Sequence, residues 1–279
     1  MKKFLKWLFI ITLIIISIII YARYIGTLGL ITKEYTIKDT NLPSDFDGLK
    51  IVHFSDLHYN RAINITKLNK VVKEINTINP DIVVFTGDLI DKDSNLTDND
   101  YIELSNILNN INAKYGKYAI LGNHDTDEDK DNVIKTYTNS NFTFLDNDHD
   151  IIYSKNNERI FIGGISPITN NTSDINKTLN VENIDSDYKI ILIHEPDLTD
   201  DIVKNYQVNL ILAGHSHNGQ IRLPIIGAIY TPPYAKKYYD EYYKIDNTNL
   251  YISSGIGVST INYRLFNHPS INFYRINKD

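Results

Sequence analysis

The sequence predicts an α/β fold built on a mainly parallel β-sheet, preceded by a transmembrane helix. Apolar runs that read as strands alternate with stretches of helical periodicity from residue 50 to residue 139. Polar residues follow several of these runs directly, which is where open α/β sheets bind ligands. An uncharged, isoleucine-rich segment lies close to the N-terminus and predicts the transmembrane helix.

The N-terminal segment has the features of an uncleaved signal anchor over residues 1–23. Lys2, Lys3 and Lys6 precede an uncharged run over residues 7–22, and Arg23 closes it. A spanning helix needs roughly 17–25 residues, and flanking cations can extend a short run by snorkelling. A cleaved signal peptide is the alternative, but no A-x-A-like cleavage site follows the run. The excess of cations before the run places the N-terminus in the cytoplasm and the rest of the chain outside it.

The rest of the chain divides into a linker over residues 24–33 and one domain over residues 34–279. Helical periodicity predicts helices over residues 66–79, 98–112 and 129–139, and Pro80 ends the first of them. The acidic stretch over residues 91–100 is expected to be a solvated surface loop. The expected strands are 34–38, 50–55, 81–86, 117–121, 142–145, 151–153, 160–165, 189–193, 210–213, 250–253 and 270–276.

Composition excludes some classes of protein and disfavours others. The 279 residues carry a net charge of −6, so there is no basic field for a nucleic-acid partner. The chain has no cysteine, which excludes a disulfide scaffold, a thiolate zinc site and a lipid anchor on cysteine. The length is sufficient for one large α/β domain with a small appendage.

Five short motifs supply the residue types that divalent cations need, namely carboxylate, imidazole and amide oxygen. Each motif follows an apolar run. Asp56 and His58 are two residues apart at a strand end, so both side chains are expected on one face. Five of the eight histidines lie in the motifs, whereas His53, His149 and His268 are interpreted as structural. The motifs are Asp56-Leu57-His58, Gly87-Asp88, Gly122-Asn123-His124-Asp125, His194-Glu195-Pro196 and Gly214-His215-Ser216-His217.

Taken in this order, the motifs resemble the calcineurin-like metallophosphoesterase family, and the resemblance extends from about residue 34 to the C-terminus. It implies a four-layer sandwich of two mixed β-sheets flanked by helices. It also implies two divalent metal ions (Mn, Fe or Zn), one of whose ligands is shared. The first ion would be held by Asp56, His58, Asp88 and His217, and the second by Asp88, Asn123, His194 and His215.

The activity implied by the resemblance is metal-dependent hydrolysis of a phosphoester bond. A water molecule between two such ions is acidified toward hydroxide and attacks phosphorus. By resemblance, His124 protonates the leaving alkoxide or stabilises the charged transition state. Asp125 is expected to hydrogen-bond His124 and fix its tautomer. Glu195 is a further candidate ligand, but a role in supporting the ligands or holding a loop is favoured because the two metal shells are already full.

The segment after the last motif resembles a membrane-anchored bacterial branch of the family, which includes enzymes acting on lipid-linked phosphodiesters or pyrophosphates. Gly219 and Gln220 carry this resemblance, while Asn218 stands where the branch commonly has glycine. Arg264 is a candidate phosphate clamp, with a structural salt bridge as an equal alternative. A tyrosine- and lysine-rich patch over residues 230–244 is either a membrane- or substrate-facing rim or ordinary packing.

These observations predict a single-pass protein of the cell membrane whose catalytic domain lies outside the cytoplasm. The expected function is hydrolysis of phosphodiester or lipid-linked pyrophosphate bonds, with the membrane and an envelope phosphoester as partners. A phosphomonoesterase and a non-catalytic metal-binding envelope scaffold are the alternatives. A nuclease and a protein phosphatase are disfavoured by the lack of basic charge and by the anchor, respectively. The oligomeric state is left open.

Overall fold

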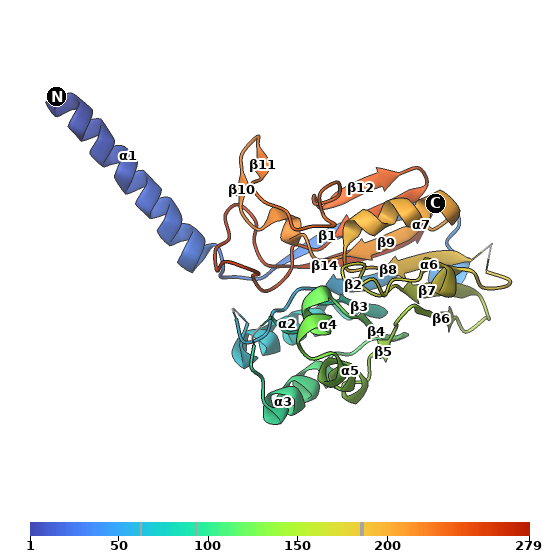
Figure 1. Ribbon diagram of the computed structural model, residues 1–279. Coiled ribbons are helices and arrows are strands. Elements are labelled where there is room, and N and C mark those ends of the chain that lie inside the picture. Colours follow the sequence, from blue (N-terminus) through green and yellow to red (C-terminus); the bar gives the residue numbers. More distant parts are fainter. Residues whose placement is uncertain (62, 93, 185–186) are drawn as a thin grey trace.

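Two six-stranded sheets form the centre of the computed structural model, which describes residues 1–61, 63–92, 94–184 and 187–279 (Figure 1). In the first sheet, β14 runs antiparallel to β2, and the other neighbouring strands are parallel. Its strands, in spatial order, are β1 (Ile31–Asp39), β14 (Ser270–Lys278), β2 (Leu49–Phe54), β3 (Ile82–Thr86), β4 (Gly116–Ile120) and β5 (Thr143–Phe144).

The second sheet has a parallel centre and antiparallel edges. Its strands, in spatial order, are β12 (Tyr242–Ile245), β13 (Thr248–Ile252), β9 (Leu210–Ala213), β8 (Tyr188–Leu192), β7 (Arg159–Gly164) and β6 (Asp148–Tyr153). A small separate hairpin projects from the domain (Figure 1), and its strands are β10 (Arg222–Leu223) and β11 (Gly227–Ala228).

Three apolar cores separate four layers, and the predicted four-layer sandwich is confirmed. One core lies between the first sheet and its helices, a second between the two sheets, and a third between the second sheet and its helices. The first sheet is covered by α2 (Ile65–Ile78), α3 (Asp98–Asn109) and α5 (Lys130–Asn139). The second is covered by the shorter helices α6 (Ile175–Leu179) and α7 (Thr199–Asn205).

The central strands are apolar along their whole length because both of their faces are buried. In β2, Val52 and Phe54 pack toward the helices, while Ile51 packs between the two sheets. The helices differ from these strands, because each helix buries only the stripe of side chains that faces the sheet. Helix α2 starts after Asn64, whose side chain accepts a hydrogen bond from the Lys67 nitrogen, and this cap sets its start.

Two features of the fold differ from the sequence-based expectations. Strand β1 begins at Ile31, inside the segment expected to be a linker, and pairs along its whole length with the C-terminal strand β14. An additional helix, α4 (Asn123–Glu128), begins inside the G-N-H-D motif and precedes the expected helix over residues 129–139. The first helical turn of α4 therefore carries the side chains of Asn123, His124 and Asp125.

Helix α1 (Lys2–Ile20) projects away from the domain and continues into a short π-helical turn, η1 (Tyr21–Ile25) (Figure 1). It is long and apolar enough to cross a membrane, and within residues 2–20 every side chain is at least partly exposed. The turn that follows is joined to the domain, because the Arg264 nitrogen donates to the Ala22 oxygen at 2.9 Å. Gly26 also lies against the Arg264 carbonyl so closely that a Cβ would come within 1.9 Å of its oxygen.

Candidate metal centre

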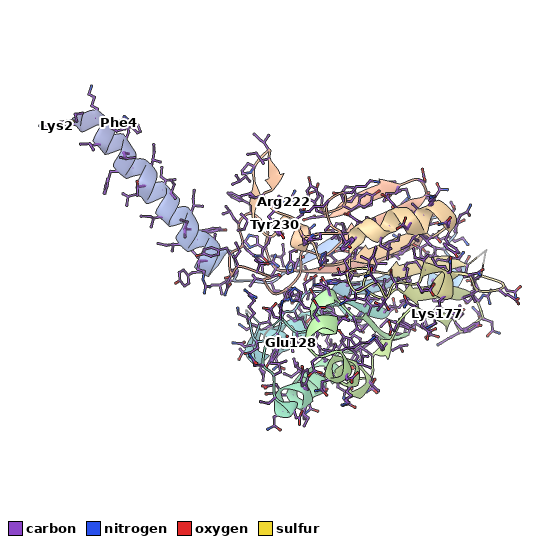
Figure 2. All side chains as sticks on the ribbon, in the orientation of Figure 1. Lys2, Phe4, Glu128, Lys177, Arg222 and Tyr230 are labelled. Carbon is purple, nitrogen blue, oxygen red and sulfur yellow. The ribbon has the colours of Figure 1, made fainter. Side chains whose placement is uncertain are left out.

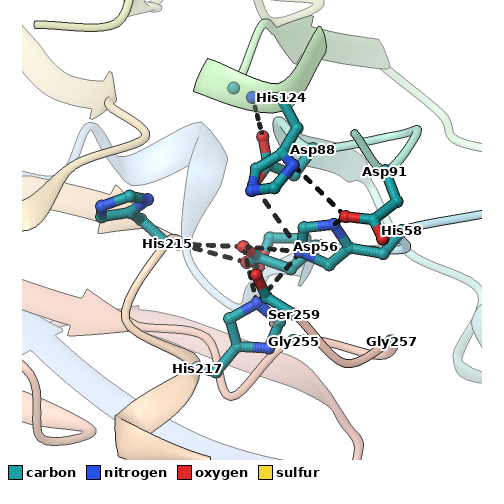
Figure 3. A network of polar contacts seen from close by, with 12 residues as sticks. Asp56, His58, Asp88, Asp91, His124, His215, His217, Gly255, Gly257 and Ser259 are labelled. Carbon is teal, nitrogen blue, oxygen red and sulfur yellow. Dashed lines mark hydrogen bonds and ion pairs between the residues drawn. The ribbon is translucent and has the colours of Figure 1, made fainter. Parts of the chain in front are cut away.

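The five motifs meet where the carboxyl ends of strands from both sheets converge. Figure 3 shows labelled residues from four of these motifs. The loops after β2, β3 and β4 approach from the first sheet, and those after β8 and β9 approach from the second. Because the strands concerned run parallel within each sheet, their ends lie along one edge. Side chains that are distant in the sequence are thereby brought into contact.

Asp56, His58 and His217 form a first buried cluster. The Nε2 atoms of His58 and His217 lie 3.1 Å apart, and Nε2 of His217 is 3.3 Å from Oδ1 of Asp56. One potential ligand atom from each residue therefore faces a common point, which is the arrangement a metal ion requires.

Asp88, His194 and His215 form a second cluster next to the first. Oδ2 of Asp88 lies 3.2 Å from Nε2 of His194 and 3.6 Å from Nε2 of His58. The Asp88 carboxylate is therefore between the two clusters, as a shared ligand would be. Its other oxygen accepts a hydrogen bond from the His124 backbone nitrogen at 3.0 Å, which fixes the carboxylate in this orientation.

The donor atoms of the second cluster are prepared to bind a cation. Nδ1 of His194 lies 2.7 Å from the Thr86 carbonyl oxygen and must donate to it, so Nε2 of the neutral imidazole has a lone pair for a cation. Nε2 of His215 donates in the same way to the Pro233 oxygen at 2.9 Å, leaving Nδ1 free. Among the described residues, Nε2 of His194 and Oδ1 of Asn123 are buried without a hydrogen-bond partner. Orphaned acceptors of this kind fit a divalent metal ion.

Five residues of the two clusters have left-handed backbone conformations. The φ angles are 52° for Asp56, 43° for His58, 57° for Asp88, 64° for His215 and 48° for His217. Such a conformation costs about 1–2 kcal/mol for a residue with a Cβ. Asp56 and His58 therefore lie beyond the regular strand, and the expected period-two placement does not apply to them. They reach a common point because the chain turns sharply after β2, and the sequence pattern does not reveal this strain.

Gly87 and Gly122 allow two of these turns to touch. Gly87 has a φ of +90°, and a Cβ on it would lie 2.3 Å from the Gly122 nitrogen. A Cβ on Gly122 would lie 2.1 Å from Oδ1 of Asp88. The glycines in the G-D and G-N-H-D motifs therefore permit the backbone contact that seats Asp88 beside the first turn of α4.

His124 contacts Asp91, the first residue of the acidic stretch that the sequence predicts to be a solvated loop. Nδ1 of His124 lies 3.2 Å from Oδ1 of Asp91, and Nδ1 of His58 lies 3.3 Å from the same oxygen. Arg61 donates to the other Asp91 oxygen. Burial opposes ionisation of Asp91, but its hydrogen bonds with His124 and His58 hold its pKa well below the usual range.

The charge environment of His124 favours its protonated form. Burial lowers the pKa of His124, but the carboxylates of Asp88 and Asp91 outweigh it and raise the pKa to about 9. The side chain is 20% exposed and lines the cavity described below. It is therefore suited to donate a proton to a group bound in that cavity.

The hydrogen bonds of the Asp125 carboxylate are made with groups other than the His124 side chain, contrary to the expectation from the sequence. This carboxylate is fully buried and accepts hydrogen bonds of 2.8–3.1 Å from four backbone nitrogens, those of Asp88, Leu89, Ile90 and Gly122. As the third residue of α4, its side chain turns back onto the start of the helix, as in a capping box. Asp125 thus holds the Gly87-Asp88 turn against α4 and acts on the backbone.

Arg264 is not positioned as a phosphate clamp. Its side chain is completely buried, and Nη2 donates to the carbonyl oxygens of Ser254, Gly255 and Gly257 at 2.6–3.0 Å. Nη2 also lies 3.3 Å from Nδ1 of His217, on the side of the ring away from the cluster. The guanidinium therefore organises the loop behind His217, and backbone carbonyls take the place of the salt-bridge partner considered as the alternative.

This placement predicts a large loss of stability for Arg264→Leu. The change leaves three buried carbonyl oxygens without their donor, at about 1–3 kcal/mol each, so we expect the free energy of unfolding to fall by about 3 kcal/mol or more. Thermal unfolding of the full chain in detergent should shift by about 6–12 °C. Arg275→Leu is the matched control, because Arg275 is 43% exposed on β14. Equal midpoints for the two variants would contradict the assigned role.

Three histidines outside the motifs have structural surroundings. His53 is buried, with Nε2 2.8 Å from the Thr86 hydroxyl, and burial lowers its pKa to about 3. His149 stacks on Phe161 with ring centroids 5.1 Å apart. His268 is exposed, and its carbonyl accepts a hydrogen bond from Ser254. None of the three belongs to the potential ligand clusters found among the described residues.

A cavity of about 520 Å³ lies over the two clusters. Its polar side is formed by Asp88, Asn123, His124, His215 and His217. The expected supporting role of Glu195 agrees with its contacts, since its carboxylate accepts a 2.6 Å hydrogen bond from Thr169 at the cavity edge. The apolar side is formed by Ile221, Ile229, Tyr230, Pro232, Pro233 and Ile261.

Comparisons with known proteins agree with this geometry. The chain is 35% identical over 257 residues to the metallophosphoesterase YkuE of Bacillus subtilis. This match covers 92% of this chain and 88% of YkuE. It is 29% identical over 232 residues to the UDP-2,3-diacylglucosamine pyrophosphatase LpxG of Chlamydia trachomatis, covering 66% and 69% of the two chains.

A solved structure supports the fold alone. The sulfate thiohydrolase SoxB of Thermus thermophilus superposes with a TM-score of 0.51 at 12% identity, covering 85% of this chain and 57% of that one. The sequence profile described as calcineurin-like phosphoesterase matches residues 49–219, more than half of the chain. With its His and Asp clusters at the convergent strand ends, the chain belongs to the calcineurin-like metallophosphoesterase family and is a hydrolase of phosphoesters.

Proposed function

We propose that this protein is a membrane-anchored phosphohydrolase with two divalent metal ions (Mn, Fe or Zn) that cleaves phosphodiester or lipid-linked pyrophosphate bonds. The observation that carries this proposal is the pair of donor clusters on either side of Asp88, under a cavity with one apolar side. Mixed nitrogen and oxygen ligands suit all three metals, so the donor set does not choose among them.

Each cluster provides the ligands for one cation. The bound pair supplies a hydroxide nucleophile near neutral pH and neutralises charge on the phosphoryl oxygens. In this proposal one cation is held by Asp56, His58, Asp88 and His217, and the other by Asp88, Asn123, His194 and His215.

The remaining polar residues orient these ligands and move a proton. The Thr86 carbonyl fixes the ring of His194, and the His124 nitrogen fixes the carboxylate of Asp88. The His124 side chain, which lines the cavity, donates a proton to the departing oxygen of the substrate. Nδ1 of His124 lies 3.2 Å from Oδ1 of Asp91 and 3.1 Å from the Lys92 backbone nitrogen, and these contacts leave Nε2 for this transfer.

The apolar side of the cavity supports a substrate that carries an apolar group beside its phosphate. Isoleucine, tyrosine and proline side chains would bind such a group, and a small hydrophilic phosphomonoester would leave them uncovered. The similar pyrophosphatase LpxG is named for a diacylated sugar nucleotide, which is an amphiphilic pyrophosphate.

Helix α1 is the basis for the proposed location. Its length and apolar surface suit a single membrane span, and Lys2, Lys3 and Lys6 lie in its first two turns. By the positive-inside rule, these cations place the N-terminus in the cytoplasm and the metal centre on the outer side.

The test compares hydrolysis of bis-p-nitrophenyl phosphate and p-nitrophenyl phosphate by the full chain in detergent, loaded with manganese. We expect faster turnover of the diester, loss of activity on chelation, and a decrease of about tenfold at most in His124→Ala, because p-nitrophenolate leaves without a proton. Preference for the monoester would identify a phosphomonoesterase. Bound metal without turnover of either substrate, or of lipid-linked pyrophosphates, would support the alternative of a non-catalytic envelope scaffold.

A further inference from the structure

The hairpin β10–β11 exposes apolar side chains at its tip. The segment Leu223–Tyr230 contains no charged residue, yet Ile225 is fully exposed and Ile226 is 71% exposed. Figure 2 shows the hairpin projecting from the domain between its labelled residues Arg222 and Tyr230. A contiguous apolar surface of this kind on a protein marks an interaction site.

This surface continues across a neighbouring loop. Ile221 pairs with Leu265, and the Arg222 nitrogen donates to the Leu265 oxygen at 3.0 Å, so the hairpin and the loop are held together. The loop exposes further apolar side chains on either side of Arg264. We call this surface the apolar rim and define it by Ile225, Ile226, Ile229, Tyr230, Ile261 and Phe266.

The apolar rim adjoins the end of the proposed membrane anchor. The backbone of Arg264, between Ile261 and Phe266, is hydrogen-bonded to Ala22 in η1. A groove of about 770 Å³ lies between α1 and the side chains of Leu265 and Phe266. In Figure 1 the hairpin and α1 extend from the same side of the domain. A bilayer that contains α1 therefore meets the rim.

Three residues of the apolar rim also line the cavity over the metal centre. Ile229, Tyr230 and Ile261 line this cavity and are exposed at the surface. The Lys236 ammonium lies 5.1 Å from the centre of the Tyr230 ring, which places a cation beside a tyrosine. Tyrosine with a neighbouring lysine suits the headgroup region of a membrane, where apolar chains meet anionic phosphate.

We propose that the apolar rim is a second membrane contact, which enters the lipid bilayer beside α1 and opens the cavity onto the membrane surface. This inference rests on the membrane anchorage proposed above. It assigns the substrate to phosphoesters whose apolar chains stay in the bilayer while the phosphate enters the cavity. The isoleucines at the hairpin tip supply buried apolar area in the membrane, and α1 keeps them close to it.

Tryptophan fluorescence tests the contact directly, because the chain contains a single tryptophan, Trp7. Full-length Ile225→Trp in a Trp7→Phe background is reconstituted in phosphatidylcholine vesicles with or without brominated acyl chains. We expect about twofold quenching by the brominated lipid. The matched control is Tyr153→Trp in the same background, since Tyr153 is exposed on β6 at the far end of the domain in Figure 1.

Emission of the Ile225→Trp variant that is no more quenched than that of Tyr153→Trp would overturn the inference. Self-association of the full chain in detergent that is lost in Ile225→Asp would likewise overturn it, because the rim would then be an interface between copies. The native chain, with Trp7 quenched, serves as the control for insertion of α1. Quenching at position 225 reports whether the apolar rim lies in the bilayer, and it does not depend on catalysis.

Hydrolysis provides a second readout. We expect the double variant Ile225→Asp, Ile226→Asp to cleave a fluorescent phospholipid diester in vesicles about tenfold more slowly than the parent. Its turnover of soluble bis-p-nitrophenyl phosphate should be unchanged, since neither residue lines the cavity. Equal rates of parent and variant on the vesicle substrate would argue against the rim. If the parent hydrolysed neither substrate, the proposed function would be wrong. The quenching result would then decide whether the apolar rim contacts the membrane.

Discussion

Asp88→Asn is expected to lower kcat/KM for phosphodiester hydrolysis by about 1,000-fold, because the charge shared by the two clusters is removed. Asparagine preserves the shape of the side chain, and its oxygen can still accept from the His124 nitrogen. It cannot place negative charge toward both His58 and His194, whose Nε2 atoms lie 3.6 and 3.2 Å from Oδ2. Metal content measured by mass spectrometry should fall together with activity.

Thermal unfolding of the Asp88→Asn variant tests whether its loss of activity comes from misfolding. Asp88 and Asp56 are both buried, and burial together with the charge of Asp88 raises the pKa of Asp56. Burial raises the pKa of Asp88, but the charges of His194, His124 and His58 outweigh it and hold the pKa well below its usual range, so the Asp88 charge stabilises the metal-free fold. The chelated Asp88→Asn variant should therefore unfold at a lower temperature than the parent, but still in one cooperative transition. Asp148→Asn is the matched control, since Asp148 is 65% exposed on β6. Undiminished activity of Asp88→Asn with full metal content would exclude the proposed centre.

The parts of the fold that could be predicted are those in which local sequence and burial agree. β3 is an apolar run buried on both faces, and α2 has a buried stripe with a capping residue before it, so both are visible in one short segment. The pairing of β1 with β14 joins residues about 240 apart. No short-range pattern encodes such a pairing, because it depends on the packing of the whole domain.

The site was predictable at the level of residue type and strand end, and less so at the level of contacts. Asp91 lies in an acidic stretch that resembles a solvated loop, yet it is buried against His58 and His124. Arg264 is a single cation in a polar loop, and the sequence does not reveal that carbonyl groups surround it. In both cases the deciding contacts come from segments far apart in the chain.

The same limit explains the choice between Asp91 and Asp125 as the partner of His124. Asp125 is next to His124 in the sequence, but successive residues at a helix start point in different directions. The third residue of a helix turns back toward the preceding backbone nitrogens, which is where Asp125 lies. Proximity in sequence therefore predicted Asp125 as the partner of His124, although the helix directs the Asp125 carboxylate away from the imidazole.

Asp91→Asn is expected to reduce kcat by about 100-fold for an alkyl phosphodiester, with KM little changed. The neutral amide of this variant would neither accept from the His124 imidazolium with full charge nor hold its pKa high. An alkoxide is a poor leaving group and needs the proton, whereas p-nitrophenolate does not. The loss for bis-p-nitrophenyl phosphate should therefore be about tenfold or less. A purely structural role for Asp91 would lower both rates equally.

Asp125→Asn provides the contrasting result. An amide at this position accepts fewer of the four backbone N–H groups and turns a donor toward the others, so the free energy of unfolding should fall by about 3 kcal/mol. The unfolding midpoint of the full chain in detergent should drop by about 6–12 °C. Asp91→Asn should also lower the midpoint, because the depressed pKa of Asp91 means that its charge stabilises the fold, so the two variants are distinguished by their rates. The two rates of the folded Asp125→Asn fraction should fall by the same factor. If Asp125→Asn, and not Asp91→Asn, reduced the rate on the alkyl diester more than the rate on bis-p-nitrophenyl phosphate, Asp91 would not be the residue that supports proton transfer by His124.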